Sequence, residues 1–138
     1  ASARRVGPAA RRMTALVDTD VMIDFLRGQA QAVAFMQAVP LPVHVSAITV
    51  AELFAGVREG EEKAALDTAL TACRVHPLTA DIAMRGGLWR RDYGRSHGVG
   101  LADALIAATA EHAGLDLVTL NARHYPMLER ISIPYRKN

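Results

Sequence analysis

The sequence predicts an α/β fold in which helices pack on a parallel sheet of about four or five strands. Short apolar runs alternate along the chain with longer segments whose apolar residues recur at helical spacing. Hydrophobic residues make up 51% of the chain and aromatic residues only 5%, which indicates an aliphatic core. The length of 138 residues is enough for one domain that buries roughly two-thirds of the surface of its unfolded chain.

Five short segments rich in apolar residues are expected to form the strands. The first, "TALVD", is a continuous apolar run of the kind that is buried on both faces of a sheet. The third contains Pro77, which has no N–H to donate and therefore indicates an edge strand or the end of a strand. The expected strands are residues 14–18, 43–46, 73–78, 115–120 and 131–135.

The segments between these strands are expected to be helical. Gly28 ends the first of them, and the sequence "PLP" stops the second. The last is apolar on almost every side, which predicts a helix buried at the centre of the fold, and a glycine-rich loop at residues 94–100 precedes it. The expected helices are residues 20–28, 29–38, 47–59, 61–72, 80–95 and 101–114.

The net charge of +2 is distributed unevenly along the chain. Residues 1–12 contain four of the 16 basic residues and no acid, so the rest of the chain is slightly acidic. We expect residues 1–12 to be a flexible basic tail. This tail is either a leader or vector-derived remnant before a natural start at Met13, or an arm that contacts nucleic acid. Residues 13–138 are expected to form a single domain.

The cysteine content and the lack of long apolar runs indicate a cytoplasmic protein. Cys73 is the only cysteine, which excludes an internal disulfide and fits a reducing compartment, and we expect an inert buried thiol. No run approaches the roughly 20 apolar residues that span a membrane. The stretch before Asp18 is too short for the core of a signal peptide.

Four polar residues are expected to lie at the carboxyl ends of the strands. Asp18 ends the first strand, and Glu52 lies in the first two turns of the helix after the second. Asp103 opens the buried helix before the fourth strand, and Asn121 follows that strand directly. Because ligands of parallel α/β sheets bind outside the carboxyl ends of the strands, these side chains are expected to meet there.

Each of these residues also has a structural explanation. Asp18 is a good N-cap for the following helix, and Glu52 stands three residues after Thr49, as in a capping box. The charge of Asp103 is favourable in a first helical turn. Asn121 could serve as a turn residue or cap a short helix.

Taken together, the acids favour a metal site. Glu52 and Asp103 lie in apolar runs that contain no basic residue, where a carboxylate needs a cation or a proton. Two carboxylates about 5 Å apart repel each other by roughly 3 kcal/mol at an effective dielectric constant of 20. Oxygen ligands favour Mg²⁺ or Mn²⁺, and the five histidines show no spacing typical of zinc ligands.

Four blocks of the sequence, "LVDTDVMIDFL", "VSAITVAELFAGV", "GLADALIAATA" and "LVTLNARHYP", resemble the PIN-domain ribonucleases. The similarity is greatest to the VapC toxins of bacterial toxin–antitoxin (VapBC) pairs and covers residues 14–135. It implies a three-layer α/β/α PIN-like fold over residues 13–138 and an acidic pocket that binds Mg²⁺ or Mn²⁺. By motif match, Asp18, Glu52 and Asp103 are catalytic acids and metal ligands. Asn121 occupies a fourth catalytic position where many relatives carry an acid.

The resemblance also assigns roles to residues around this pocket. Thr19 matches a small hydroxyl residue that hydrogen-bonds a metal-bound carboxylate or water. Asp20 stands where asparagine is commoner, and it adds a charge that the neutral Asn121 lacks, so one or two bound ions are both compatible with the sequence. His124 is expected at the rim. The candidates for contacts with RNA are Arg27, Arg90, Arg91, Arg95, Arg123 and His124.

The family resemblance implies a reaction and partners. A divalent ion would supply hydroxide for attack on an RNA phosphodiester, so the protein is expected to be an endoribonuclease, which is a hydrolase. VapC toxins usually form homodimers and are inhibited by a cognate VapB-like antitoxin that lays its C-terminal segment across the acidic groove. Apolar surface on helices 20–38 and 48–72 would suit that contact.

Two other functions remain compatible with parts of the sequence. "LVDTDVM" resembles the Asp-x-Asp signature of HAD-type phosphohydrolases, with Asp18 as nucleophile and Asp20 as general acid. That family also needs a lysine and a late acidic pair, and a receiver domain needs the lysine too. Lys63 and Lys137 are the only lysines, and neither is placed for this role. The other alternative is a PIN-like module that binds RNA or a partner without cleaving RNA.

Overall fold

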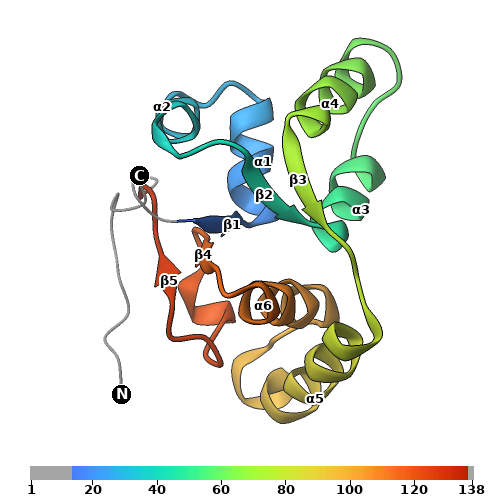
Figure 1. The fold of residues 1–138 in the computed structure, drawn as a ribbon, viewed down its shortest axis with the longest axis vertical. Coiled ribbons are helices and arrows are strands. Elements are labelled where there is room, and N and C mark those ends of the chain that lie inside the picture. Colours follow the sequence, from blue (N-terminus) through green and yellow to red (C-terminus); the bar gives the residue numbers. More distant parts are fainter. Residues whose placement is uncertain (1–13, 137–138) are drawn as a thin grey trace.

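The computed structural model describes residues 14–136, in which a five-stranded sheet lies between two layers of helices (Figure 1). The strands are β1 (Ala15–Val17), β2 (Val43–Ser46), β3 (Cys73–His76), β4 (Asp116–Val118) and β5 (Ile131–Ser132). The helices are α1 (Thr19–Leu26), α2 (Ala30–Ala38), α3 (Ala47–Ala55), α4 (Glu61–Thr71), α5 (Ala80–His97), α6 (Leu101–Ala113) and the short 3-10 helix η2 (Ala122–His124). The predicted basic tail, residues 1–12, lies outside the described residues.

All neighbouring strands run parallel, in the order β3-β2-β1-β4-β5. Leu16 of β1 lies opposite His44 of β2 on one side and Leu117 of β4 on the other. β3 forms one edge of the sheet, as Pro77 predicts. The chain runs outward from β1 through β2 to β3 and then returns to add β4 on the other side of β1. In parallel α/β sheets, such a reversal opens a crevice at the carboxyl ends of the two strands that flank it.

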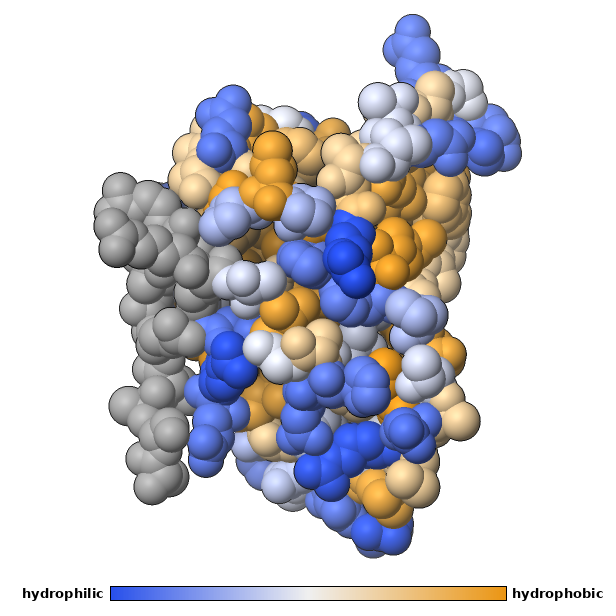
Figure 2. All heavy atoms as spheres, viewed as in Figure 1, coloured by the Kyte–Doolittle hydropathy of each residue, from blue (hydrophilic) through white to orange (hydrophobic). Residues whose placement is uncertain are grey.

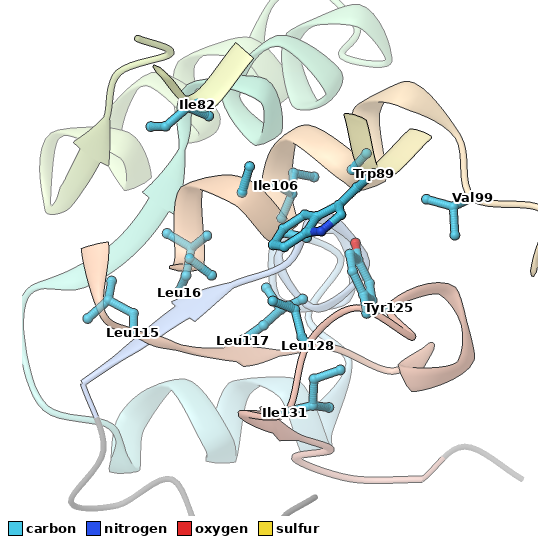
Figure 3. Close-up of a cluster of buried hydrophobic side chains, with 14 residues drawn as sticks. Leu16, Ile82, Trp89, Val99, Ile106, Leu115, Leu117, Tyr125, Leu128 and Ile131 are labelled. Carbon is cyan, nitrogen blue, oxygen red and sulfur yellow. The ribbon is translucent and has the colours of Figure 1, made fainter. Parts of the chain in front are cut away.

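Helices α1 to α4 cover one face of the sheet, and α5 and α6 cover the other (Figure 1). Because side chains alternate along a strand, neighbouring residues of β1 enter different cores. Val17 packs with Met22 and Val45 in the core beneath α1 to α4. Leu16 packs with Leu117 in the core beneath α5 and α6 (Figure 3). The α/β fold with three layers and a parallel sheet is therefore confirmed.

Close packing of α5 on α6 depends on Gly86. A Cβ atom at this position would lie 2.6 Å from Leu105 Cδ2 and 3.1 Å from its Cα, so a side chain here would push the two helices apart. Helix α6 is buried along most of its length, as its apolar sequence predicts, and it carries Asp103 in its first turn. The packing of α5 on α6 therefore fixes where Asp103 lies.

Some elements differ from the sequence prediction. Helix α3 ends at Ala55 rather than near residue 59. Helix α5 continues to His97 and ends on Gly98, whose φ of 64° is left-handed, so the glycine-rich loop shortens to residues 98–100. Cys73 is half-buried rather than buried, and this burial still raises the pKa of its thiol and keeps it protonated. No helix within residues 14–136 is both long and apolar enough to cross a membrane.

Candidate active site

Asp18 lies at the carboxyl end of β1, beside the end of β4, and is only 5% exposed. Its Oδ1 accepts a hydrogen bond from the backbone N–H of Thr19 (2.7 Å), so it is also the N-cap of α1. Its Oδ2 accepts hydrogen bonds from the hydroxyls of Thr119 and Tyr125, both at 2.7 Å. Thr119 follows β4 directly, so the two strands at the reversal share this carboxylate.

Tyr125 connects Asp18 to Asp103. Its hydroxyl oxygen is 2.7 Å from Asp18 Oδ2 and 3.3 Å from Asp103 Oδ1. The distance between these two carboxylate oxygens therefore cannot exceed the sum of the two contacts. Its ring is buried in the core beneath α5 and α6, near Trp89 and Leu128 (Figure 3). The sequence analysis missed Tyr125. It lies within the block "LVTLNARHYP", but nothing in its spacing distinguishes it from an ordinary core tyrosine.

Asp103 also faces His124, as expected for a histidine at the rim. Its Oδ2 lies 3.5 Å from His124 Nδ1, which forms an ion pair when the imidazole is protonated. The carboxylate of Asp103 is partly exposed, whereas that of Asp18 is buried. The pair of acids thus has one buried member and one that faces the solvent.

Glu52 reaches the site through a hydroxyl. Thr19 Oγ1 donates to Glu52 Oε1 at 2.7 Å and lies 2.9 Å from Thr49 Oγ1. The expectation that apolar neighbours bury Glu52 is wrong, because α3 turns Leu53 into the core and leaves Glu52 exposed. The capping-box explanation is also wrong, because Ser46 is the N-cap of α3 and accepts from the backbone N–H groups of its first turn. Thr19 links Glu52 to Asp18, because its hydroxyl donates to Glu52 and its backbone N–H donates to Asp18.

Asp20 ties the loop after β4 to the start of α1. Its Oδ1 accepts from the N–H of Val21 (2.7 Å), and its Oδ2 accepts from the N–H of Leu120 (3.0 Å). Asn121 is exposed and places its side-chain amide 3.5 Å from the same Oδ2. Asn121 thus lies beside Asp20 rather than with Asp103, and its side chain does not cap η2.

The basic candidates are not equally available. Arg27 lines a depression together with Glu52. Arg91 forms an ion pair with Asp92 (2.9 Å) on the surface of α5. Figure 2 shows hydrophilic residues gathered over the lower half of one face, where α5 lies in Figure 1. The remaining candidates are exposed and, within residues 14–136, contact no acid of the site; they are Arg90, Arg95 and Arg123.

Burial changes the acid–base properties of this group. Desolvation, followed by the nearby charge of Asp20, raises the pKa of Asp18 from 3.8 to about 7, against the opposing hydrogen bonds from Thr119 and Tyr125. Burial also raises the pKa of Asp20. Burial and the adjacent Asp18 raise the pKa of Tyr125, so its hydroxyl keeps its proton and remains a donor. Near neutral pH, a nearby cation would favour the ionised form of Asp18.

The donor set fits a hard divalent cation only in part. Carboxylate and hydroxyl oxygens are the ligands that Mg²⁺ and Mn²⁺ prefer, and the group contains no thiol. Within residues 14–136, however, no three acid, histidine or cysteine side chains come close enough together to share one ion. The arrangement is a pair, Asp18 and Asp103, with Glu52 held on the far side of the Thr19 hydroxyl.

The sequence model of the PIN-domain family matches residues 15–129, so the chain belongs to this family. It is similar to Ribonuclease VapC10 of Mycobacterium tuberculosis, with 42% identity over 123 residues that cover 87% of this chain and 92% of the relative. Ribonuclease VapC19 of the same species is 41% identical and covers 87% of this chain and 98% of the relative. The resemblance to the VapC-type PIN domains is thus confirmed, and the phosphohydrolase and receiver alternatives lose their basis.

Solved structures of similar chains agree with this family. A chain of a toxin–antitoxin complex from Klebsiella pneumoniae superimposes with a TM-score of 0.78 and is 28% identical, covering 89% of this chain and 99% of that one. A chain of FitAcB from Neisseria gonorrhoeae gives a TM-score of 0.69 at 29% identity, covering 87% of this chain and 97% of that one. Both superpositions span the sheet and its helix layers.

Proposed function

We propose that the protein is a Mg²⁺- or Mn²⁺-dependent endoribonuclease and the toxin of a toxin–antitoxin pair. The observation that carries the proposal is the pair Asp18 and Asp103, joined by the Tyr125 hydroxyl in the crevice of a PIN-domain sheet. Relatives named as ribonucleases support the reaction. The single cysteine and the kind of reaction support a cytoplasmic location.

In this proposal Asp18 and Asp103 are the direct metal ligands, and Glu52 is the third. A bound divalent ion would lower the pKa of its water and offset charge on the scissile phosphate. The Tyr125 hydroxyl lies between the two acids, 2.7 Å from Asp18 Oδ2 and 3.3 Å from Asp103 Oδ1, and can donate its single proton to either one. Thr19 orients Glu52 through its hydroxyl, which donates to Glu52 Oε1 at 2.7 Å.

Contacts to RNA come from the partly exposed side of the pair. His124 lies against Asp103 and, when protonated, adds positive charge next to the metal ligands. Arg95 and Arg123 are exposed and unpaired with any described acid, so they are available for phosphate groups. Arg91 would have to exchange Asp92 for a phosphate, which makes its contribution smaller.

We propose a cognate VapB-like antitoxin as the partner, because a similar chain occurs in a toxin–antitoxin complex from Klebsiella pneumoniae. An apolar depression of about 310 Å³ lies between α1, α2 and α4 and includes Met22, Phe25 and Met36. It agrees with the apolar surface expected on helices 20–38 and 48–72. A homodimer is also proposed, since Met84 and Leu88 expose apolar side chains one turn apart on α5.

The experiment is a cleavage assay on the protein freed of antitoxin. Ribosomal RNA is incubated with wild type in Mn²⁺, in Mg²⁺ or in EDTA, beside Asp103→Asn and the matched surface variant Asp67→Asn. We expect cleavage by wild type and Asp67→Asn only with metal, and a loss of at least about 100-fold in Asp103→Asn. No cleavage by wild type would refute the nuclease, and equal cleavage by Asp103→Asn would refute the site.

A second candidate is a PIN-like module that binds RNA or a partner without cleaving RNA. It is favoured by the neutral Asn121 and by the lack, within residues 14–136, of three converging ligand side chains. This alternative predicts that wild type binds RNA in EDTA and that added Mn²⁺ produces no fragments. It also predicts that Asp103→Asn binds RNA at least as well as wild type, because a negative charge has been removed.

A further inference from the structure

An opening in the surface borders Asp20. It is an open depression of about 430 Å³, a size within the range of about 300–1,000 Å³ that is typical of small-ligand sites. Its lining residues are Asp20, Leu120, Asn121, Ile133, Tyr135 and Arg136. Because β5 runs parallel to β4, the segment that follows β5 reaches the same edge of the sheet as the catalytic acids.

The walls of this depression are held by hydrogen bonds. Asp20 is fixed by the backbone N–H groups of Val21 and Leu120. Tyr135 is buried and donates from its hydroxyl to Asp24 Oδ2 at 2.8 Å, which anchors the segment after β5 to α1. Because these hydrogen bonds already hold the walls in place, little of the binding energy of a ligand would be spent on ordering them.

Among the described residues that line the depression, Arg136 carries the one cationic group. Within residues 14–136, Arg136 takes part in no ion pair. By contrast, Arg58, Arg85, Arg91 and Arg130 each lie against a carboxylate. An exposed arginine without such a partner, at the rim of a depression, is suited to a phosphate.

The depression is adjacent to the metal-ligand pair. Thr119 Oγ1 donates to Asp18 Oδ2 at 2.7 Å and lies 3.4 Å from Asp20 Oδ2, so one hydroxyl lies between Asp18 and the carboxylate that lines the depression. On the opposite side, His124 lies against Asp103. An RNA strand that crosses the acids therefore meets basic groups at both ends, at η2 and at Arg136.

We propose that this depression binds the RNA nucleotide next to the scissile phosphate, with Arg136 on a phosphate of that nucleotide and the Asn121 amide facing its base or ribose. This inference rests on the proposed ribonuclease function. It requires a single-stranded nucleotide, because the bases of an A-form duplex are stacked and paired and do not enter a depression of this kind.

The test compares Arg136→Ala and Arg136→Lys with a matched control, Arg74→Ala, which removes an exposed arginine of the edge strand β3. Binding of a fluorescein-labelled single-stranded RNA of mixed sequence is measured by anisotropy in EDTA over a range of salt concentrations. We expect Arg136→Ala to raise Kd about three- to tenfold and to make the salt dependence shallower by about 0.7 in log–log slope. Arg136→Lys should keep the slope, and all three variants should melt within a few degrees of wild type.

Cleavage of ribosomal RNA separates the possible failures. We expect Arg136→Ala to lower the rate at low RNA concentration and to keep it within about twofold of wild type at saturation, because Arg136 binds RNA rather than the reacting atoms. If wild type cleaves RNA but Arg136→Ala matches Arg74→Ala in Kd, slope and rate, only the depression is refuted. If wild type does not cleave RNA at all, the proposed function and this inference are both refuted.

Discussion

Replacing Asp18 by asparagine should stabilise the metal-free protein near pH 7.5 and abolish RNA cleavage. Burial raises the pKa of Asp18 from 3.8 to about 7, so the native state holds this proton more tightly than the unfolded chain does. Between these two pKa values the unfolded chain binds fewer protons, and the stability of the metal-free protein therefore falls as the pH rises from about 4 to about 7. Asparagine does not ionise, so the stability of Asp18→Asn does not fall for this reason over the same pH range.

The magnitude follows from the difference in pKa. A pKa difference of about three corresponds to roughly 4 kcal/mol of unfolding free energy. This is an upper limit for Asp18 alone, because part of the shift comes from repulsion by the Asp20 carboxylate. Asparagine keeps an acceptor for the Thr19 N–H, but its amide nitrogen then faces the hydroxyls of Thr119 and Tyr125. Both hydroxyls can turn to accept, at a cost of about 1 kcal/mol. A net gain of about 1–3 kcal/mol at pH 7.5 remains.

Thermal unfolding in EDTA measures this gain. For a domain of this size, about 1–3 kcal/mol corresponds to a rise in Tm of roughly 3–12 °C at pH 7.5. At pH 5 the advantage should shrink by more than half, because Asp18 is then largely protonated in the native state. Added Mn²⁺ should raise the Tm of wild type but not that of Asp18→Asn.

Asp67→Asn serves as the control, since Asp67 is an exposed acid paired with Lys63 on α4. Its Tm should differ from wild type by a similar small amount at both pH values. The reasoning is refuted if Asp18→Asn melts at or below the wild-type temperature at pH 7.5. A stabilisation of equal size at pH 5 and pH 7.5 would refute it as well.

Three further substitutions test the surroundings of this carboxylate. Tyr125→Phe keeps the buried ring but removes the hydroxyl shared by the two acids, so kcat should fall about 10- to 100-fold; unchanged kcat would remove Tyr125 from the site. Thr19→Val removes the hydroxyl bound to Glu52, so cleavage should fall and the protein should lose about 1 kcal/mol of stability in urea unfolding, and Thr19→Ser should restore cleavage. Gly86→Ala places a methyl group against Leu105 and should cost about 1–3 kcal/mol by the same measurement, and a neutral result would mean that α5 and α6 separate easily.

Sequence patterns predicted most elements because the information they use is local. The apolar run at β1, the N-cap at Asp18 and the continuous apolar surface of α6 each depend on residues within a few positions. The parallel order of strands brings the residues after β1 and β4 to one edge, where Thr119 donates to Asp18. Asp103 approaches Asp18 from the first turn of α6, with the Tyr125 hydroxyl between them. Family motifs added Glu52, whose link to Asp18 through Thr19 agrees with that placement.

Periodicity and motif spacing are properties of the chain alone, and they were enough to predict the α/β class and the PIN-domain family. Which side chains touch, by contrast, depends on the folded arrangement. The contact of Tyr125 with Asp18 joins residues 107 positions apart, and it depends on how η2 turns after β4. The exposure of Glu52 depends in the same way on the rotation of α3 about its axis, and the position of Arg136 depends on the parallel course of β5. Such contacts combine the register and orientation of several elements, and no short stretch of sequence encodes that combination.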